Sequence, residues 1–181
     1  MDDASERLKE LIQTGRARGY ILYDEIDEPL TEAGDAQLDI ALTELAVNGI
    51  EILEGPGASY DAGLQKLNEE LDSPSQMYLS QVMTIPRQTR EEEIELAKRI
   101  SHGGEGAEDA MRQLIEANLY LVVAAASRNG AATHGLLELI QEGNIGLMKA
   151  AQRYEHTREY RFATFAIWWI RRSIEDSKLE H

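Results

Sequence analysis

The sequence predicts an all-α protein in which a small acidic N-terminal helical region is joined by a linker to a compact helical bundle. Three observations support this fold class. Apolar residues recur at helical spacing over most of the chain, capping residues precede several of these segments, and the stretch GPGASYDAG combines glycines with a proline and lacks periodicity. We expect the helical region over 1–55, the linker over 56–72 and the bundle over 73–177.

Three short helices and one extended piece are predicted before the linker. The first helix is predicted to begin near Ser5 as its cap and to end near Gly15 or Gly19. The second covers 23–30 and the third covers 35–48. The apolar face of the third helix comprises Leu38, Ile40, Leu42, Leu45 and Ala46. The alternating segment IEIL that follows predicts a short extended piece.

Five helices are predicted after the linker. The first of them covers 73–83, with Ser73 as its cap and Pro74 in its first turn. Its apolar side comprises Met77, Tyr78 and Val82.

The remaining four helices are bounded by clear local signals. Thr89 and Glu92 form a capping box that starts the next helix, which ends before the glycines of SHGGEGAED. One long helix is predicted over 107–128. After a glycine-bracketed break, two more are predicted over 136–154 and 162–176. No segment after the linker has the pattern of a strand.

Composition excludes several classes of protein. The chain has no run of eighteen apolar residues, and its acidic N-terminus is unlike a signal peptide, so we expect a cytosolic protein without a membrane segment. It has no cysteine, and its four histidines are scattered, so no metal site or cofactor is expected. Since a phosphate-binding loop, a nucleophile with a positioned histidine and an HExxH motif are all missing, no catalytic residues and no enzyme activity are expected.

The charge is distributed unevenly. The formal net charge is −15, and residues 1–72 hold 18 acidic but only 5 basic side chains. Between residues 153 and 172 the sign reverses, because five arginines face only Glu155 and Glu159. Arginine clusters of this kind suit phosphate binding, whereas the acidic part is typical of a solubilising surface.

The segment 136–150 has two different faces. Its apolar stripe comprises Leu136, Leu139, Ile140, Leu147 and Ala150. Its polar face comprises Glu138, Gln141, Glu142, Asn144 and Lys149. The polar face is either a solvated surface or an interface. Gly143 and Gly146 are unfavourable in a helix interior, so we expect a neighbouring helix to approach closely there.

The stretch YRFATFAIWWIRR interleaves aromatic residues with arginines. Adjacent residues of a helix point about 100° apart, so we expect at least one edge of Trp168 or Trp169 to be exposed. Exposed rings beside arginines suit single-stranded nucleic acid. A core stripe with incidental arginines and a protein-binding hot spot are the alternatives.

Several segments together resemble a known family. IEANLYLVVAAA, ELIQEGNIGLMKA and RYEHTREYRFATFAIWWIRRSI resemble, in order and spacing, the central domain of bacterial primary sigma factors. SPSQMYLSQVMTIPRQTREEEIELAKRI resembles the segment before that domain, and GYILYDEIDEPL resembles the acidic N-terminal region of housekeeping members. The resemblance implies a transcription initiation factor that binds core RNA polymerase and recognises and melts the promoter minus-ten element. A protein-interaction module without DNA binding of its own is the alternative.

The resemblance also implies a role for particular residues. A coiled coil on the clamp of the largest polymerase subunit would bind Glu138, Gln141, Glu142, Asn144 and Met148. The pocket for a flipped adenine of the non-template strand would comprise Tyr154, Glu155, Arg158, Tyr160 and Phe165. Trp168 and Trp169 would wedge against the last base pair, and Arg161 and Arg171 would contact phosphates. A second flipped base would be held by Leu79, Glu93, Asn118 and Leu121.

Some positions depart from the family pattern. Arg172 replaces a usual Gln and Glu175 a usual Thr, at positions associated with reading the base pair upstream of the flipped adenine. Phe165 replaces a usual Tyr, which removes a hydroxyl and keeps the stacking face. SRNGAATHG lacks common basic residues, and Ser80 replaces a usual Arg, so weaker DNA contacts are expected there. KLEH at 178–181 resembles an expression scar, and the chain is expected to be a fragment of a longer protein.

Overall fold

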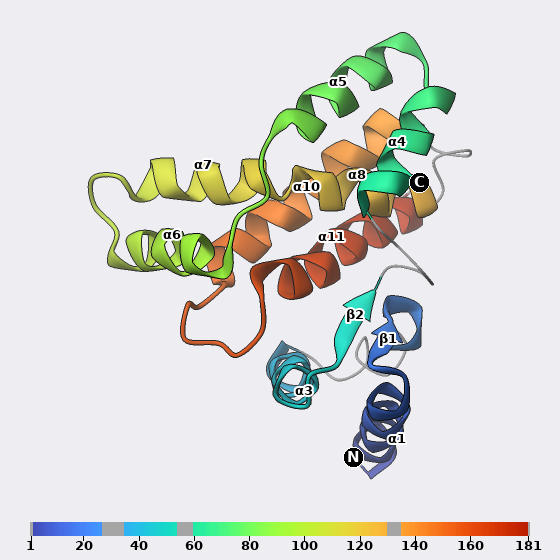
Figure 1. The fold of residues 1–181 in the computed structure, drawn as a ribbon, viewed down its shortest axis with the longest axis vertical. Coiled ribbons are helices and arrows are strands. Elements are labelled where there is room, and N and C mark those ends of the chain that lie inside the picture. The colour runs from blue at the N-terminus through green and yellow to red at the C-terminus, as the bar shows by residue number, and fades with distance from the viewer. Residues whose placement is uncertain (1, 27–34, 54–59, 130–134, 181) are drawn as a thin grey trace. The chain divides into compact units, whose positions relative to one another are not determined.

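The computed structural model describes residues 2–26, 35–53, 60–129 and 135–180 (Figure 1). Contacts divide the chain into two compact units, the first formed by residues 1–58 with 158–160 and the second by 59–157 with 161–181. Helices dominate both units, and the β structure of the described residues is one two-stranded sheet. The predicted all-α fold class is therefore confirmed. Within the described ranges, no helix is both long and apolar enough to cross a bilayer.

The first unit is built on a parallel strand pair. Helix α1 (Asp2–Arg18) leads into β1 (Tyr20–Leu22), and α3 (Asp35–Val47) leads into β2 (Glu51–Leu53). Ile21 of β1 pairs with Ile52 of β2 and is fully buried. A glycine with positive φ follows each helix, Gly19 at 85° directly after α1 and Gly49 at 69° two residues after α3, and lets the chain turn toward the strand.

The first unit corrects two sequence predictions. Ser5 lies inside α1 and is not its cap, although the helix does end beside Gly19 as expected. Ile40 is 54% exposed, because the buried side of α3 follows the spacing of Leu38, Leu42 and Leu45, and Ile40 points elsewhere. The extended piece after α3 is confirmed as β2. The second predicted helix is described only over 23–26, and the rest of it lies outside the described residues.

The second unit consists of helices. Its first helix, α4 (Tyr60–Glu70), lies within the range that we expected to be a linker. The glycines in this range led the sequence analysis to predict a linker instead of a helix. Leu64 is the buried residue of α4. The N-terminus of α4 is held by Arg87, which pairs with Asp61 at 2.7 Å and lies 3.2 Å from the ring centroid of Tyr120.

The next two helices show how capping set their starts. In α5 (Ser73–Thr84), Asp72 is the cap and accepts a bond from the Ser75 N–H, so the expected cap, Ser73, is instead the first helical residue. Met77 of α5, expected on the apolar side, is 67% exposed, and Leu79 and Val82 are buried. In α6 (Arg90–His102), the predicted capping box of Thr89 and Glu92 is confirmed, with bonds of 3.2 and 2.8 Å.

The predicted long helix over 107–128 is wrong, because it is divided at Asn118 into α7 (Ala107–Ala117) and α8 (Leu119–Arg128). The Asn118 side chain donates to the Leu114 carbonyl at 2.8 Å, and its own N–H bonds to the Ile115 carbonyl at 3.0 Å. Asparagine thereby offers the backbone an alternative to regular helical bonding.

The last two helices form a closely packed pair, α10 (Leu136–Arg153) and α11 (Phe162–Leu179) (Figure 1). A Cβ atom added at Gly146 would lie 2.8 Å from the Ile170 Cα and would also meet the Trp169 carbonyl. A Cβ atom at Gly143 would lie 2.7 Å from the Val122 side chain. The expected close approach at these glycines is confirmed. Helix α11 continues past the predicted end and includes Lys178 and Leu179.

Replacing Gly146 with Ala should destabilise the protein, because the new methyl group meets the backbone of α11, which cannot move aside as a side chain can. We expect Gly146→Ala to lower the free energy of unfolding by about 1–3 kcal/mol, measured by urea titration followed by circular dichroism. Gly63→Ala in α4 is the matched control: nothing lies within 4 Å of its added Cβ, so it should be neutral or stabilising. Equal effects of the two changes would contradict the close approach.

Candidate functional site

Aromatic rings gather where α10 ends and α11 begins. The Tyr154 ring lies 5.3 Å from Phe162 and 6.0 Å from Phe165, centroid to centroid. Phe165 in turn lies 6.0 Å from Trp169 in an edge-to-face arrangement, and the Arg153 guanidinium lies 4.4 Å from the Trp169 ring centroid. We call this set the ring cluster. The structure thus brings together three sequence-predicted residues, Tyr154, Phe165 and Trp169, and adds Phe162 and Arg153.

The expected exposure of a tryptophan edge is wrong. Trp168 is 4% exposed and Trp169 is 8% exposed. The reason is that α11 packs against both α8 and α10, so side chains that point about 100° apart each meet a neighbouring helix. Helical spacing within α11 alone indicates one contact side, and the second neighbouring helix adds another.

Tyr154 stays uncharged at ordinary pH. Burial raises the pKa of its hydroxyl to about 12, and the nearby Glu93 carboxylate acts in the same direction. The side chain therefore offers an apolar ring and a neutral hydroxyl that can donate or accept a hydrogen bond.

A buried carboxylate holds the start of α11. Glu93 of α6 is 4% exposed and accepts bonds from Arg161 at 2.9 Å (Nε) and 2.7 Å (Nη2). The same carboxylate accepts the Phe162 N–H at 3.4 Å, one of the N–H groups that a helix leaves unbonded at its first turn. Hydrogen bonding to Glu93 raises the pKa of Arg161. This bidentate pair therefore fixes α11 to α6, although these residues are 68 positions apart in the sequence.

The residues predicted to hold a second base are all buried. Leu79, Glu93, Asn118 and Leu121 are between 1% and 4% exposed. Leu79 belongs to α5, whereas Asn118 and Leu121 lie where α7 passes into α8. Of the four, Glu93 is the one that the described contacts connect to another predicted DNA-binding residue, Arg161.

The other predicted DNA-binding residues are dispersed. Arg158 and Tyr160 are grouped with the first unit, where both contact Asp39, Arg158 through an ion pair of 2.7 Å. Arg171 is 7% exposed and donates to the Asn129 side chain at 3.3 Å. Four of the predicted DNA-binding residues are exposed: Glu155, Arg161, Arg172 and Glu175.

The polar face of α10 is open to solvent. Glu138, Gln141 and Met148 are exposed, and Glu142 and Asn144 are half-buried. Two apolar residues that the sequence analysis did not single out lie on the same face, Leu137 at 39% and Ile145 at 47% exposed. Leu137 lies four residues before Gln141 and Ile145 lies four residues after it, which places all three on one face of the helix. This spacing could have identified both residues from the sequence.

Comparisons with known proteins show which proteins this chain is similar to. The family description "Sigma-70 region 2" matches residues 114–180, "Sigma-70 factor, region 1.1" matches 2–76, and "Sigma-70 factor, region 1.2" matches 76–105. The RNA polymerase sigma factor SigA of Lactococcus lactis subsp. lactis is 48% identical over 107 residues, which are 59% of this chain and 28% of that protein. The RNA polymerase sigma factor SigA of Clostridium acetobutylicum is 34% identical over 177 residues, 92% of this chain and 45% of that protein. The chain thus spans less than half the length of these relatives.

Removing the charge of Glu93 should loosen α11. We expect Glu93→Gln to lower the free energy of unfolding by about 1.5–3 kcal/mol, because the amide cannot accept both Arg161 bonds and the Phe162 N–H as a carboxylate does. Glu95→Gln, an exposed position on the same helix, should change it by less than about 0.5 kcal/mol. Urea titration measures both, and a loss of the same size in the two variants would contradict the role given to Glu93.

Proposed function

Because the chain belongs to the sigma-70 family and carries its regions 1.1, 1.2 and 2, we propose that it acts in transcription initiation. In this proposal it binds core RNA polymerase and captures flipped bases of the non-template strand of the promoter minus-ten element. The observation that carries the proposal is the ring cluster, which groups aromatic side chains beside Arg153 in the most basic stretch of the chain.

The ring cluster would capture a base without further chemistry once side chains move, because Phe165 and Trp169 are each only 8% exposed in the free chain. Unstacking a base costs a few kcal/mol, and stacking on an aromatic ring returns about 1–3 kcal/mol per base. The Arg153 guanidinium lies over the Trp169 ring in the free chain. A flipped base would compete for such a ring face, and the displaced guanidinium could then bind a phosphate.

Arg161 would contact the DNA backbone while it stays bound to Glu93. Its side chain remains 44% exposed in the ion pair, whereas that of Glu93 is 5% exposed. The carboxylate therefore fixes the direction of the guanidinium, and its exposed N–H groups are available to a phosphate. In this reading Glu93 supports base capture through Arg161 and through the position of α11.

The exposed face of α10 would bind the clamp coiled coil of the largest polymerase subunit. Leu137, Ile145 and Met148 are 39–48% exposed and lie on the same helix as the exposed Glu138 and Gln141. Apolar side chains bordered by polar ones are typical of a protein interface. These three residues also favour the alternative, a protein-interaction module that binds its partner without reading DNA.

An oligonucleotide titration separates the two functions. A labelled single-stranded minus-ten oligonucleotide and a scrambled one are titrated against the chain by fluorescence anisotropy, with the clamp coiled coil at saturation. We expect preferential binding of the minus-ten strand, weakened about tenfold by Phe165→Leu, which keeps an apolar side chain but removes the stacking ring. Tyr60→Leu removes a ring outside the cluster and should leave the preference unchanged.

Two outcomes count against base capture. Equal affinity for the two oligonucleotides, with the coiled coil bound, would favour the protein-interaction module. Equal weakening by Phe165→Leu and Tyr60→Leu would mean that the rings matter through stability alone. Thermal unfolding of both variants, followed by circular dichroism, shows whether each is folded at the temperature of the titration.

A further inference from the structure

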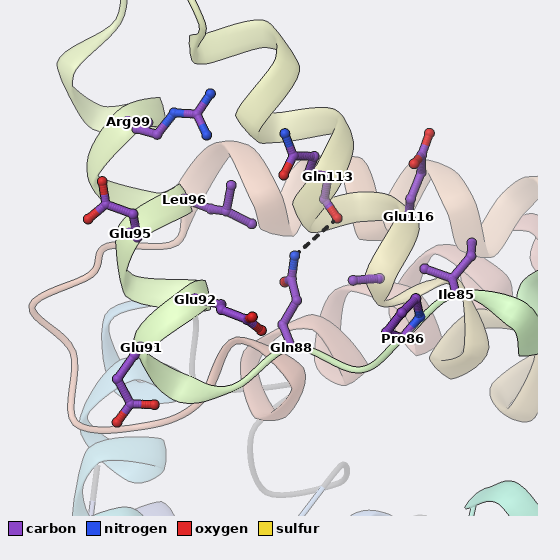
Figure 2. A pocket seen from close by; sticks show the side chains of 11 residues that line it. Ile85, Pro86, Gln88, Glu91, Glu92, Glu95, Leu96, Arg99, Gln113 and Glu116 are labelled. Carbon is purple, nitrogen blue, oxygen red and sulfur yellow. Dashed lines mark hydrogen bonds between the residues drawn. The ribbon is translucent and has the colours of Figure 1, made fainter.

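An acidic groove lies on the side of the second unit formed by α6, α7 and the loop that precedes α6 (Figure 2). Its volume is about 610 Å³. Leu96, Ala117 and Pro86 give it apolar walls, and four carboxylates line it from both helices. These are Glu91, Glu92, Glu95 and Glu116.

The groove carries a strong excess of negative charge. Arg99 is the one basic residue that lines it. The Arg99 guanidinium donates to the Gly106 carbonyl at 3.4 Å and forms an ion pair with Asp109 at 3.8 Å, near the start of α7. The excess repels nucleic acid and attracts a cationic partner. Within the described ranges, no group of three or more acidic or histidine side chains is placed to hold a metal ion.

A buried acceptor in the groove also points to a ligand. The Gln88 side-chain oxygen is buried and accepts no hydrogen bond among the described residues. In Figure 2 the amide of Gln88 reaches into the groove between α6 and α7, and its NH₂ group donates to the Gln113 carbonyl at 3.5 Å. A buried acceptor without a donor is unfavourable, so a ligand that brings an N–H group would be stabilised there.

We propose that this groove binds an extended segment of a partner protein that carries Lys or Arg beside apolar residues. The apolar walls would cover the aliphatic parts of that segment, the glutamates would attract its cations, and Gln88 would accept one of its N–H groups. A peptide suits the site better than a small molecule, because the groove is open to solvent and would leave much of a small ligand uncovered. The groove is separate from the ring cluster and from the exposed face of α10.

The test uses the whole chain and a labelled synthetic peptide that alternates lysine with leucine and proline. Fluorescence anisotropy should detect binding, and Glu95→Gln combined with Glu116→Gln should weaken it at least about fivefold. The matched control is Glu69→Gln combined with Glu70→Gln, which removes the same charge from exposed positions on α4 and should leave the affinity unchanged. A peptide with glutamate in place of lysine should not bind.

Backbone amide NMR of the wild-type chain gives a second measurement that needs no variant. The lysine peptide should shift the amide signals of residues 85–99 and 113–117 before others. Absent binding, equal weakening by the two double variants, or shifts spread over the acidic N-terminal region would overturn the proposal. Shifts of the groove signals on self-association would assign it to a second copy, and shifts caused by an oligonucleotide would assign it to nucleic acid; either would also overturn the proposal.

Discussion

The close approach of α10 and α11 is the constraint on which the candidate site depends. The backbone at Trp169 and Ile170 lies so near Gly146 that any side chain there would meet it. This approach places Tyr154, at the end of α10, against Phe162 and Phe165 at the start of α11. It leaves the opposite face of α10 exposed, with Leu137, Ile145 and Met148. The proposed DNA and polymerase surfaces are thus two sides of one helix pair.

The Glu93–Arg161 pair gives this arrangement its second fixed point. Glu93 binds both the Arg161 guanidinium and the Phe162 N–H, so α6 determines where α11 starts. Burying the Glu93 carboxylate costs free energy because the charge loses its hydration. The bidentate bonds from Arg161 and the N-terminus of α11 compensate for this loss. Two residues predicted as DNA contacts are therefore also structural, and their substitution changes stability as well as binding.

Local signals in the sequence predicted most of the helices but little of their burial. The Thr89–Glu92 capping box and the starts of the two last helices are encoded by neighbouring residues, and the structure confirms them. The division at Asn118 was missed because a side-chain bond to Leu114 competes with an otherwise favourable helical pattern. The burial of Trp168 and Trp169 depends on α8 and α10 together, and periodicity within one helix cannot show a second neighbouring helix.

Intrinsic tryptophan fluorescence during oligonucleotide binding shows whether bases reach the ring cluster. The chain has two tryptophans, and both lie on α11, so their emission reports this helix alone. Base capture at the ring cluster predicts that a minus-ten strand bound with the clamp coiled coil quenches the emission, because bases stack on or beside Trp169, while a scrambled strand does not. Binding of the minus-ten strand that leaves the tryptophan emission unchanged would contradict the account.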